Sequence, residues 1–247
     1  MNNPILTGDL SGKTIFITGA ARRLGRRMAL AAARAGADVI IHYGHSDDEA
    51  EQTRSEIQAL GRGAELLQAD FNNLDQVEAL LGRAADFAPI DALVNNASIF
   101  EALDLAQTDL KAWERHQRIN LTAPFLLSKA FATTLAGDEG RIINILDWRA
   151  LRPGADHFAY TISKAGLAAL TRSLAIALAP RITVNGVAFG AILPPADGGD
   201  TDEILQDVPA RRWADLQEVD QTVLFLLTAP TYITGEIIHL DGGRHLV

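Results

Sequence analysis

Tyr160 and Lys164 stand four positions apart in a segment whose apolar residues recur with helical spacing. Residues four apart share one face of a helix, so the phenol and the ammonium are expected on the same side. A phenol is a poor acid near neutral pH, but a neighbouring ammonium favours its anion and makes proton donation and recovery easier. The pair is therefore a candidate proton-transfer site, and a solvated helix face is the alternative that the spacing alone leaves open.

A glycine-containing turn is the second candidate for chemistry. Thr18, Gly19 and Gly25 lie between a β-branched run and a segment of helical period. Such a turn brings backbone N–H groups and the positive end of a helix dipole together, and glycine lets a pyrophosphate approach the backbone. The G-x-G-x-x-G spacing is absent, so a purely structural tight turn stays open as the alternative.

The end of the second predicted strand bears on which dinucleotide would bind. A carboxylate there favours NAD, whereas basic groups accommodate the 2′-phosphate of NADP. Arg22 and Arg23 lie on the glycine turn, which favours NADPH, while Asp47 and Asp48 follow the strand closely and oppose an added phosphate. The strand and the residues after it read His42, Tyr43, Gly44, His45 and Ser46. Ser46 also fits, with Glu49, a capping box that starts the next helix.

These candidates need elements that position them. Strands are predicted at residues 14–18, 38–43, 64–68, 92–95, 141–145, 181–187 and 236–240. Helices are predicted at 24–35, 47–60, 74–85, 110–135, 157–178 and 216–227. The alternation predicts an α/β fold with one domain over residues 1–247, in which a doubly wound, Rossmann-type, seven-stranded parallel sheet carries helices on both faces. Residues 190–210 are expected to form an irregular substrate loop, or simply a surface loop.

Composition narrows the function classes. The 247 residues are 48% hydrophobic and 21% charged, as in a soluble globular protein. A net charge of −9 argues against nucleic acid or an anionic membrane as partner and leaves a small-molecule substrate as the expectation. The chain has no cysteine, which excludes disulfides, thiolate metal sites and a cysteine nucleophile, and no histidine spacing predicts a metal site. A cytoplasmic location is expected because the sequence has neither a signal-like start nor a long apolar segment.

Taken in order, the motifs resemble those of the short-chain dehydrogenase/reductase family. They are Thr18, Gly19 and Gly25, then Asn95, Asn96 and Ala97, then Asn120, Tyr160 and Lys164, and finally residues 185–190. The resemblance implies hydride transfer from a nicotinamide, with Tyr160 as proton donor, Lys164 holding the nicotinamide ribose and Asn120 fixing a water in a proton relay. It also implies that Asp70 lies beside the adenine and Asn96 beside the adenine ribose.

The resulting cofactor prediction covers a larger set of positions. The residues expected at NADPH are Gly19, Arg22, Arg23, Leu24, Gly25, His42, Tyr43, His45, Ser46, Asp70, Phe71, Asn96, Ala97, Ser98, Tyr160, Lys164, Gly190 and Ile192. The family also implies a homotetramer with the helices at 110–135 and 157–178 in its interfaces.

Two departures from the common family pattern carry information about the substrate. Arg23 replaces the middle glycine of the turn, and Asp147 stands where a catalytic serine is expected, thirteen residues before Tyr160. A serine hydroxyl can donate to a developing oxyanion, whereas an ionised aspartate would repel it. An aspartate fits instead a ring C=N bond whose nitrogen must gain a proton.

Pteridine reductases and bacterial dihydromonapterin reductases resemble this chain at those positions. The shared features are the Arg of the turn, the His-Tyr-x-x-Ser run from His42, an aromatic residue (Phe100) after Asn-Ala-Ser, the Asp in place of Ser, and the ending Asp-Gly-Gly-Arg-His-Leu at 241–246. His45 and Phe189 depart from that pattern: trypanosomatid-type pteridine reductases have an arginine at the first position and a proline is usual at the second.

The predicted function is NADPH-dependent reduction of a dihydropterin, namely dihydromonapterin, dihydrobiopterin or dihydrofolate, to the tetrahydropterin. Asp147 and Tyr160 are expected to assist protonation, and Phe100 to stack on the pterin; a core or lid aromatic is the alternative for Phe100. Arg23, Ser98, Phe100, Asp147 and Tyr160 form the predicted substrate site. The alternatives are an NADPH-dependent carbonyl reductase, such as a 3-oxoacyl-thioester reductase, and a non-catalytic NADPH-binding module.

Overall fold

The seven predicted strands form one sheet in the computed structural model, which describes residues 8–193 and 201–247. The strands are β1 (Thr14–Ile17), β2 (Asp38–Tyr43), β3 (Ala64–Gln68), β4 (Ala92–Asn95), β5 (Gly140–Asp147), β6 (Ile182–Phe189) and β7 (Ile237–Leu240). Their order is β3-β2-β1-β4-β5-β6-β7, and every neighbouring pair is parallel. This is the predicted doubly wound sheet.

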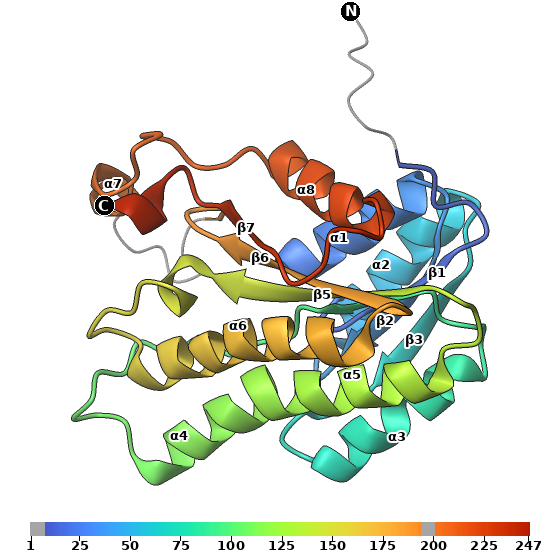
Figure 1. Cartoon of the computed structure of the whole chain (residues 1–247), viewed down its shortest axis with the longest axis horizontal. Helices are drawn as coiled ribbons and strands as arrows, with labels where there is room; N and C mark the ends of the chain where they lie inside the picture. Colours follow the sequence, from blue (N-terminus) through green and yellow to red (C-terminus); the bar gives the residue numbers. More distant parts are fainter. Residues whose placement is uncertain (1–7, 194–200) are drawn as a thin grey trace, which may run out of the picture.

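Helices cover both faces of the sheet (Figure 1). They are α1 (Arg23–Arg34), α2 (Asp47–Ala59), α3 (Leu74–Ala85), α4 (Leu110–Gln117), α5 (Ala123–Thr134), α6 (Phe158–Leu178), α7 (Thr201–Gln206) and α8 (Leu216–Thr228). One apolar core lies between the sheet and α1 with α8, and includes Met28 and Val223. The other lies between the sheet and α3 with α5, and includes Leu80 and Phe131. Burial of apolar side chains on both faces explains why the strands read as nearly continuous hydrophobic runs.

The sheet order places a crevice where the site is expected. Strands β1 and β4 are neighbours, but the chain leaves β1 toward β2 on one side and reaches β5 from β4 on the other. In open α/β sheets, ligands bind outside the carboxyl ends of the strands at such a switch point. The glycine turn follows β1 and Asn96 follows β4, so both predicted dinucleotide motifs lie at this crevice.

Four predicted elements differ from the structure. The helix predicted over 110–135 is interrupted by a π-helical turn at Arg118–Thr122, which separates α4 from α5. The irregular loop predicted over 190–210 contains the short helix α7; residues 194–200 lie outside the described part of the chain. Strands β5 and β6 each run two residues further than predicted, because their pairing continues to Asp147 and Phe189.

Side chains cap the starts of α3, α4 and α8, whereas one predicted cap is absent. The side chain of Asn73 accepts from the backbone N–H groups of Asp75 and Gln76 at the start of α3. Asp215 and Glu218 form a reciprocal capping box at α8. The capping box predicted at Ser46 is not formed, since the Ser46 side chain makes no cap hydrogen bond at the start of α2. Among the described residues, no helix is both long enough and apolar enough to cross a membrane.

Candidate active site

A cavity of about 570 Å³ opens at the carboxyl ends of the central strands. Every residue predicted at the cofactor lines it, from the glycine turn through His42–Ser46, Asp70, Asn96 and Lys164 to Gly190 and Ile192. The substrate residues Arg23, Ser98, Phe100, Asp147 and Tyr160 line it as well. The two predicted groups therefore share one continuous space.

The glycine turn has the geometry of a cradle. Gly19 has a φ of +63°, and a Cβ at Gly25 would collide with the carbonyl oxygen of Gly19, so the turn and α1 approach too closely for any other side chain. Arg23 also adopts a positive φ, of +50°. This conformation favours glycine and explains why glycine is common here in the family; Arg23 occupies it at an energetic cost. The residues present fit a dinucleotide with its phosphates on this turn.

Asn96 and Thr18 hold the turn from the β4 side. The Asn96 amide donates to the carbonyl oxygens of Thr18 (2.8 Å) and Gly19 (3.1 Å). The Thr18 hydroxyl accepts from the backbone N–H groups of Asn96 and Ala97, each at 2.9 Å. Asn96, predicted beside the adenine ribose, thus has a structural role in fixing the turn.

His42 links the glycine turn to the end of β3. Its Nδ1 accepts from the Gly19 backbone N–H at 3.1 Å, and its Nε2 lies 3.0 Å from the Ala69 carbonyl oxygen. The ring stacks on Phe71 with 4.3 Å between centroids. Burial lowers the pKa of His42 to about 4, so the ring is neutral at physiological pH.

The predicted 2′-phosphate residues gather at the outer end of the cavity. The cavity is lined there by Arg22, Arg23, His45 and Ser46, and both arginines are exposed. Asp47 begins α2 immediately beyond them. Two guanidinium groups and a histidine can meet an added phosphate, with the carboxylate of Asp47 as a nearby opposing charge.

Tyr160 and Lys164 share one face of α6, as their spacing predicts, and both are buried. The Tyr160 hydroxyl donates to Asp147 Oδ2 at 3.3 Å. Lys164 Nζ donates to the Ile145 carbonyl oxygen at 2.7 Å and lies 5.8 Å from the centre of the Tyr160 ring. The three predicted catalytic side chains from β5 and α6 therefore meet in one place.

The electrostatics of this trio differ from the expectation for an isolated Tyr–Lys pair. Burial and the charge of Asp147 raise the pKa of Tyr160 well above 10, instead of the ammonium lowering it. Burial also raises the pKa of Asp147, against the opposing effects of Arg149 and Lys164. Burial lowers the pKa of Lys164 to about 8. Asp147 disfavours the ionisation of Tyr160, whereas the hydrogen bond from Tyr160 partly offsets the effect of burial on Asp147. The two oxygens are joined by this hydrogen bond and titrate as one coupled pair.

Arg149 contacts the Asp147 carboxyl group, and sequence reasoning missed it. Its backbone N–H donates to Asp147 Oδ1 at 2.9 Å, and its guanidinium lies 3.6 Å from the same oxygen. The guanidinium also binds Asp156 Oδ2 at 2.8 Å. No spacing rule connects these residues, because the turn after β5 and the loop before α6 bring them together.

Phe100 is an exposed aromatic at the mouth of the cavity, with 56% of its surface accessible, which argues against the core alternative. Its ring meets Tyr160 edge-on at 4.7 Å and stacks on His157 at 4.2 Å between centroids. A flat ring at this place can stack on a flat ligand. Sequence reasoning assigned no role to His157, and its contact with Phe100 is a second feature that this reasoning missed.

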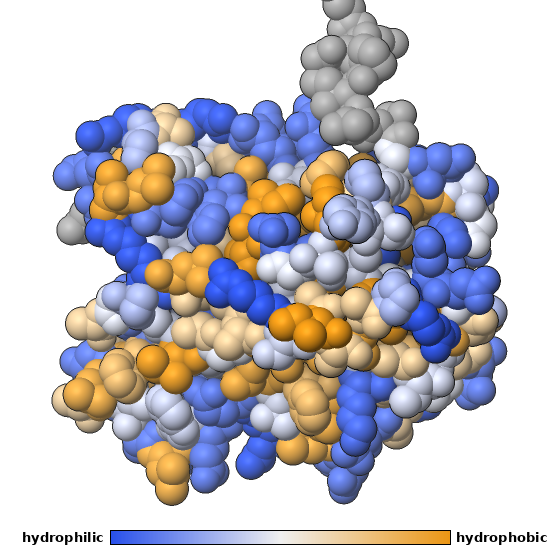
Figure 2. All heavy atoms as spheres, in the orientation of Figure 1, coloured by the Kyte–Doolittle hydropathy of each residue, from blue (hydrophilic) through white to orange (hydrophobic). Residues whose placement is uncertain are grey.

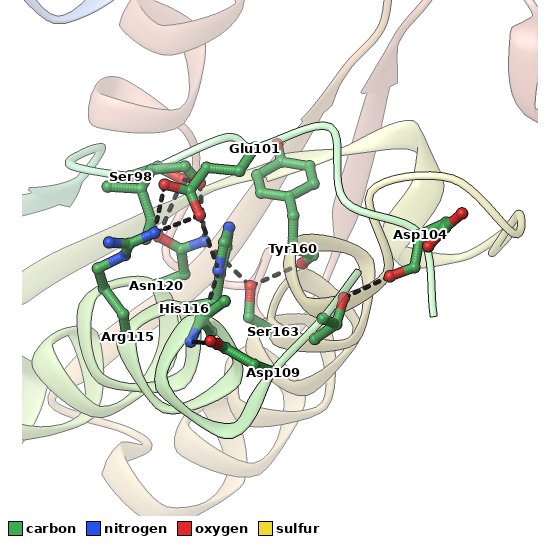
Figure 3. Close-up of polar contacts among 12 residues, drawn as sticks. Ser98, Glu101, Asp104, Asp109, Arg115, His116, Asn120, Tyr160 and Ser163 are labelled. Carbon is green, nitrogen blue, oxygen red and sulfur yellow. Dashed lines mark hydrogen bonds and ion pairs between the residues drawn. The ribbon is translucent and has the colours of Figure 1, made fainter. Parts of the chain in front are cut away.

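Asn120 is not among the residues that line the cavity. Figure 3 shows its side chain between Ser98 and Ser163. Its side-chain oxygen accepts from the Ile99 backbone N–H (3.0 Å) and the Ser98 hydroxyl (3.1 Å). Its amide donates to the Ile99 carbonyl oxygen and the Ser163 hydroxyl, both at 3.0 Å. All four of these hydrogen bonds are made with protein groups, and Asn120 itself lies in the π-helical turn. The water-holding role of Asn120 stays a prediction.

Comparisons with known proteins agree with this geometry. Residues 19–245 match the family described as enoyl-(acyl carrier protein) reductase. A 3-oxoacyl-[acyl-carrier-protein] reductase from Synechocystis sp. is 36% identical over 240 residues, which cover 95% of this chain and 97% of that protein. A 2-dehydro-3-deoxy-D-gluconate 5-dehydrogenase from Escherichia coli is 35% identical, with 95% and 96% covered.

A similar solved structure carries a name with a different substrate from those of the sequence relatives. FolM alternative dihydrofolate reductase 1 from Brucella canis, complexed with NADP, superposes with a TM-score of 0.89 at 36% identity, covering 96% of each chain. The sequence relatives and the structural relative therefore agree on the fold and differ in the substrates that their names state. With the family match spanning almost the whole sequence, the chain belongs to the short-chain dehydrogenase/reductase family.

Proposed function

We propose that this oxidoreductase uses NADPH to reduce a dihydropterin to the tetrahydropterin. The observation that carries the proposal is the pairing of Asp147 with the Tyr160 hydroxyl at 3.3 Å, beneath the exposed ring of Phe100. A carboxyl group at this position can pass a proton to an acceptor nitrogen, whereas its ionised form would repel a developing oxyanion. Similarity to FolM alternative dihydrofolate reductase 1 supports the same substrate class.

Reduction of a ring C=N bond adds a hydride to the carbon and a proton to the nitrogen, and different residues assist each addition. NADPH supplies the hydride when bound. Asp147 and Tyr160 hold the proton between their oxygens and deliver it to the ring nitrogen, directly or through a water. The Lys164 ammonium is held in place by its hydrogen bond to the Ile145 carbonyl oxygen. As a buried cation, it returns a proton to the Asp147–Tyr160 pair after the transfer. Phe100 orients the flat substrate by stacking.

The raised pKa of Asp147 gives this proposal a pH dependence. Burial keeps a proton on the Asp147–Tyr160 pair at pH values where an exposed aspartate is already ionised. The protonated pair is the active form, so kcat for a dihydropterin decreases as the pH rises through the raised pKa of Asp147. In the Asp147→Asn variant, the residual kcat should no longer decrease as the pH rises through this range.

NADPH is the proposed cofactor because Arg22, Arg23, His45 and Ser46 line the outer end of the cavity. Two structural relatives were crystallised with NADP, which supports the choice. A charge-assisted arginine–phosphate contact contributes on the order of 1.5 to 3 kcal/mol, and Asp47 and Asp48 reduce that gain. We expect a higher kcat/KM with NADPH than with NADH; equal values would contradict the assignment.

A carbonyl reductase is the second candidate, favoured by the names of the sequence relatives. The 3-oxoacyl-[acyl-carrier-protein] reductase of Synechocystis sp. shares 36% identity with this chain over 95% of its length. Against it stands Asp147, since in its ionised form the carboxylate at the tip of β5 would repel the oxyanion that such a substrate develops.

The deciding experiment measures NADPH oxidation by the wild-type protein against a panel of substrates. Dihydrobiopterin, dihydromonapterin and dihydrofolate form one arm, and 3-oxoacyl thioesters with a sugar ketone form the other. We expect turnover in the first arm and little in the second. Turnover confined to the second arm would refute the proposal, and no turnover in either would favour a non-catalytic NADPH-binding module.

We further propose that the protein is a homotetramer in which α4, α5 and α6 cover one another across the interfaces. Large apolar side chains on these helices are exposed in the single chain: Leu110 at 71%, Phe125 at 43% and Ile176 at 83%. Surface of this kind is usually covered by a partner. Sedimentation velocity should give four times the 26.6 kDa chain mass; a monomer at micromolar concentration would contradict the proposal.

A further inference from the structure

A second cavity, of about 690 Å³, lies beside the active site. The turn after β5 contributes Trp148 and Arg152, the segment after α7 contributes Asp207 and Arg211, and the C-terminal 3-10 turn contributes Arg244. Figure 2 shows this edge of the molecule hollowed between the C-terminal segment with α7 and the loop that follows β5. Neither the proposed proton transfer nor the dinucleotide site uses these residues.

The cavity gathers positive charge without neutralising it. Six other arginines pair with carboxylates: Arg26, Arg27, Arg54, Arg115, Arg149 and Arg212. Within residues 8–193 and 201–247, Arg152, Arg211 and Arg244 make no ion pair, and Asp207 is the one carboxylate side chain in the lining. The lining side chains thus include three guanidinium groups and one carboxylate, and Val247, the last residue of the sequence, lines the cavity as well.

Arg244 is held in place and still lacks a hydrogen-bond partner at one buried atom. Its guanidinium lies over the Trp148 ring, 4.5 Å from the centroid, and its backbone carbonyl oxygen accepts from Arg152 Nη1 at 3.2 Å. Its Nε is buried and has no hydrogen-bond partner among the described residues. Burial lowers the pKa of Arg244 and the charge of Arg149 adds to this effect, while the carboxylates of Asp207, Asp147 and Asp156 oppose it. Leaving a buried guanidinium N–H without a hydrogen-bond partner is costly, and an anion in the cavity could supply that partner.

The cavity is connected to the reacting groups through side chains already described. Trp148 follows Asp147 directly in the sequence. The Arg149 guanidinium lies 4.7 Å from the centre of the Trp148 ring, 5.9 Å from the centre of the Phe100 ring, and 3.6 Å from Asp147. A continuous row of aromatic and guanidinium groups therefore leads from Phe100 to Arg244. A substituent on a flat ring that stacks on Phe100 can extend along this row toward Arg244.

We propose that Arg152, Arg211 and Arg244 form a subsite for the carboxylates of a substrate's tail, so that the enzyme prefers a dihydropterin bearing a glutamate, as dihydrofolate does, over one with an uncharged side chain. The inference rests on the proposed dihydropterin reductase function. Guanidinium groups bind carboxylates through paired, charge-assisted hydrogen bonds. A polyol side chain, as in dihydromonapterin, gains no such contacts. The subsite therefore acts on KM and leaves the proton transfer at Asp147 unchanged.

The kinetic test replaces all three arginines with glutamine, singly and together, and compares two substrates. In the triple variant the KM for dihydrofolate should rise at least about tenfold, with kcat unchanged, while the KM for dihydromonapterin stays the same. The matched control is Arg212→Gln, which removes an exposed arginine paired with Glu218 outside the cavity. An unchanged dihydrofolate KM, or an equal rise for both substrates, would overturn the proposal.

A binding test separates this inference from the function on which it rests. Isothermal titration of p-aminobenzoylglutamate into the protein with NADP⁺ should show binding that weakens with added salt and is lost in the triple variant. If no dihydropterin is reduced but this binding is seen, the subsite stands and the proposed function fails. If dihydropterins are reduced and the fragment does not bind, the subsite is wrong. A triple variant that changes the oligomeric mass instead would assign the cavity to a second copy of the chain and overturn the proposal.

Discussion

The dinucleotide end and the substrate end of the main cavity differ in how their polar groups are arranged. At the dinucleotide end, formed by residues 18–25 with His42 and Asn96, the polar atoms of the turn are already bonded to one another through short hydrogen bonds. At the substrate end, formed by Phe100, Asp147 and Tyr160, buried titratable groups face each other with raised pKa values. A rigid cradle suits a ligand common to a whole family, whereas groups that exchange protons determine which substrate reacts.

The largest effect is expected at the substrate end from Tyr160→Phe. The phenyl ring keeps the edge-on contact with Phe100, but the hydroxyl that donates to Asp147 is lost. General acid catalysis contributes about 10² to 10⁴ in rate, so kcat should decrease by that factor on any substrate. Steady-state kinetics measure the loss, and an unchanged KM for NADPH serves as the control. A variant with more than a tenth of the wild-type kcat would remove Tyr160 from the chemistry.

The next effect belongs to the dinucleotide end. In Gly25→Ala, the new methyl group collides with the Gly19 carbonyl oxygen, so the turn must shift. We expect a loss of about 2 to 4 kcal/mol in the free energy of unfolding and a large rise in the KM for NADPH. Gly82→Ala is the matched control, because no atom lies within 4 Å of a Cβ there and α3 should gain up to about 1 kcal/mol. Chemical denaturation compares the two, and equal stabilities would show that the turn is pliable.

Phe100→Ala tests whether the substrate end of the cavity can be changed without affecting the dinucleotide end. Stacking on a flat heterocycle contributes about 1 to 3 kcal/mol, so the KM for a dihydropterin should rise about tenfold or more while that for NADPH stays unchanged. Phe87→Ala, at a similarly exposed ring away from the cavity, is the control. A lower melting temperature with an unchanged dihydropterin KM would instead make Phe100 a packing residue.

The smallest expected effect is a pH dependence of stability from His42. Its pKa is about 4 in the folded chain and near 6.5 when unfolded, so between these values the unfolded chain binds the extra proton. Stability should therefore fall with decreasing pH in this window, by up to about 1.4 kcal/mol per pH unit from this residue. His42→Gln should flatten that slope in urea titrations at pH 4.5, 5.5 and 6.5. An identical slope in the variant would show that His42 is protonated without cost.

Much of the dinucleotide end could be predicted, because it depends on local patterns. The sheet and the glycine turn follow from β-branched runs, helical periodicity and the residues around Gly19 and Gly25. Arg23 could be recognised as a departure, but its positive φ follows from the path of the backbone into α1. The unpredicted π-helical turn at Asn120 arises where α4 and α5 join, in a segment whose helical period continues without interruption.

Less of the substrate end could be predicted, because it depends on loops that meet in space. Asp147 stood out by its distance from Tyr160, yet its neighbours Arg149 and His157 carry no spacing signal. The expectation that Lys164 lowers the pKa of Tyr160 was wrong, since burial and Asp147 dominate at the hydroxyl. The helix α7 was missed because the surrounding proline and glycine residues are typical of irregular loops.

The role of Asp147 is tested most directly by four rates: Asp147→Asn and Asp147→Ser, each with a dihydropterin and with a 3-oxo ester. Asn keeps the size and one acceptor but cannot transfer the proton, so kcat for the dihydropterin should fall by about 10² to 10⁴. Ser should be equally poor on the dihydropterin and at least as good as the wild type on the ester, since it restores a hydroxyl donor. Melting curves exclude misfolding. Full dihydropterin activity in Asp147→Asn, or a wild type that reduces the ester and ignores every dihydropterin, would contradict the account.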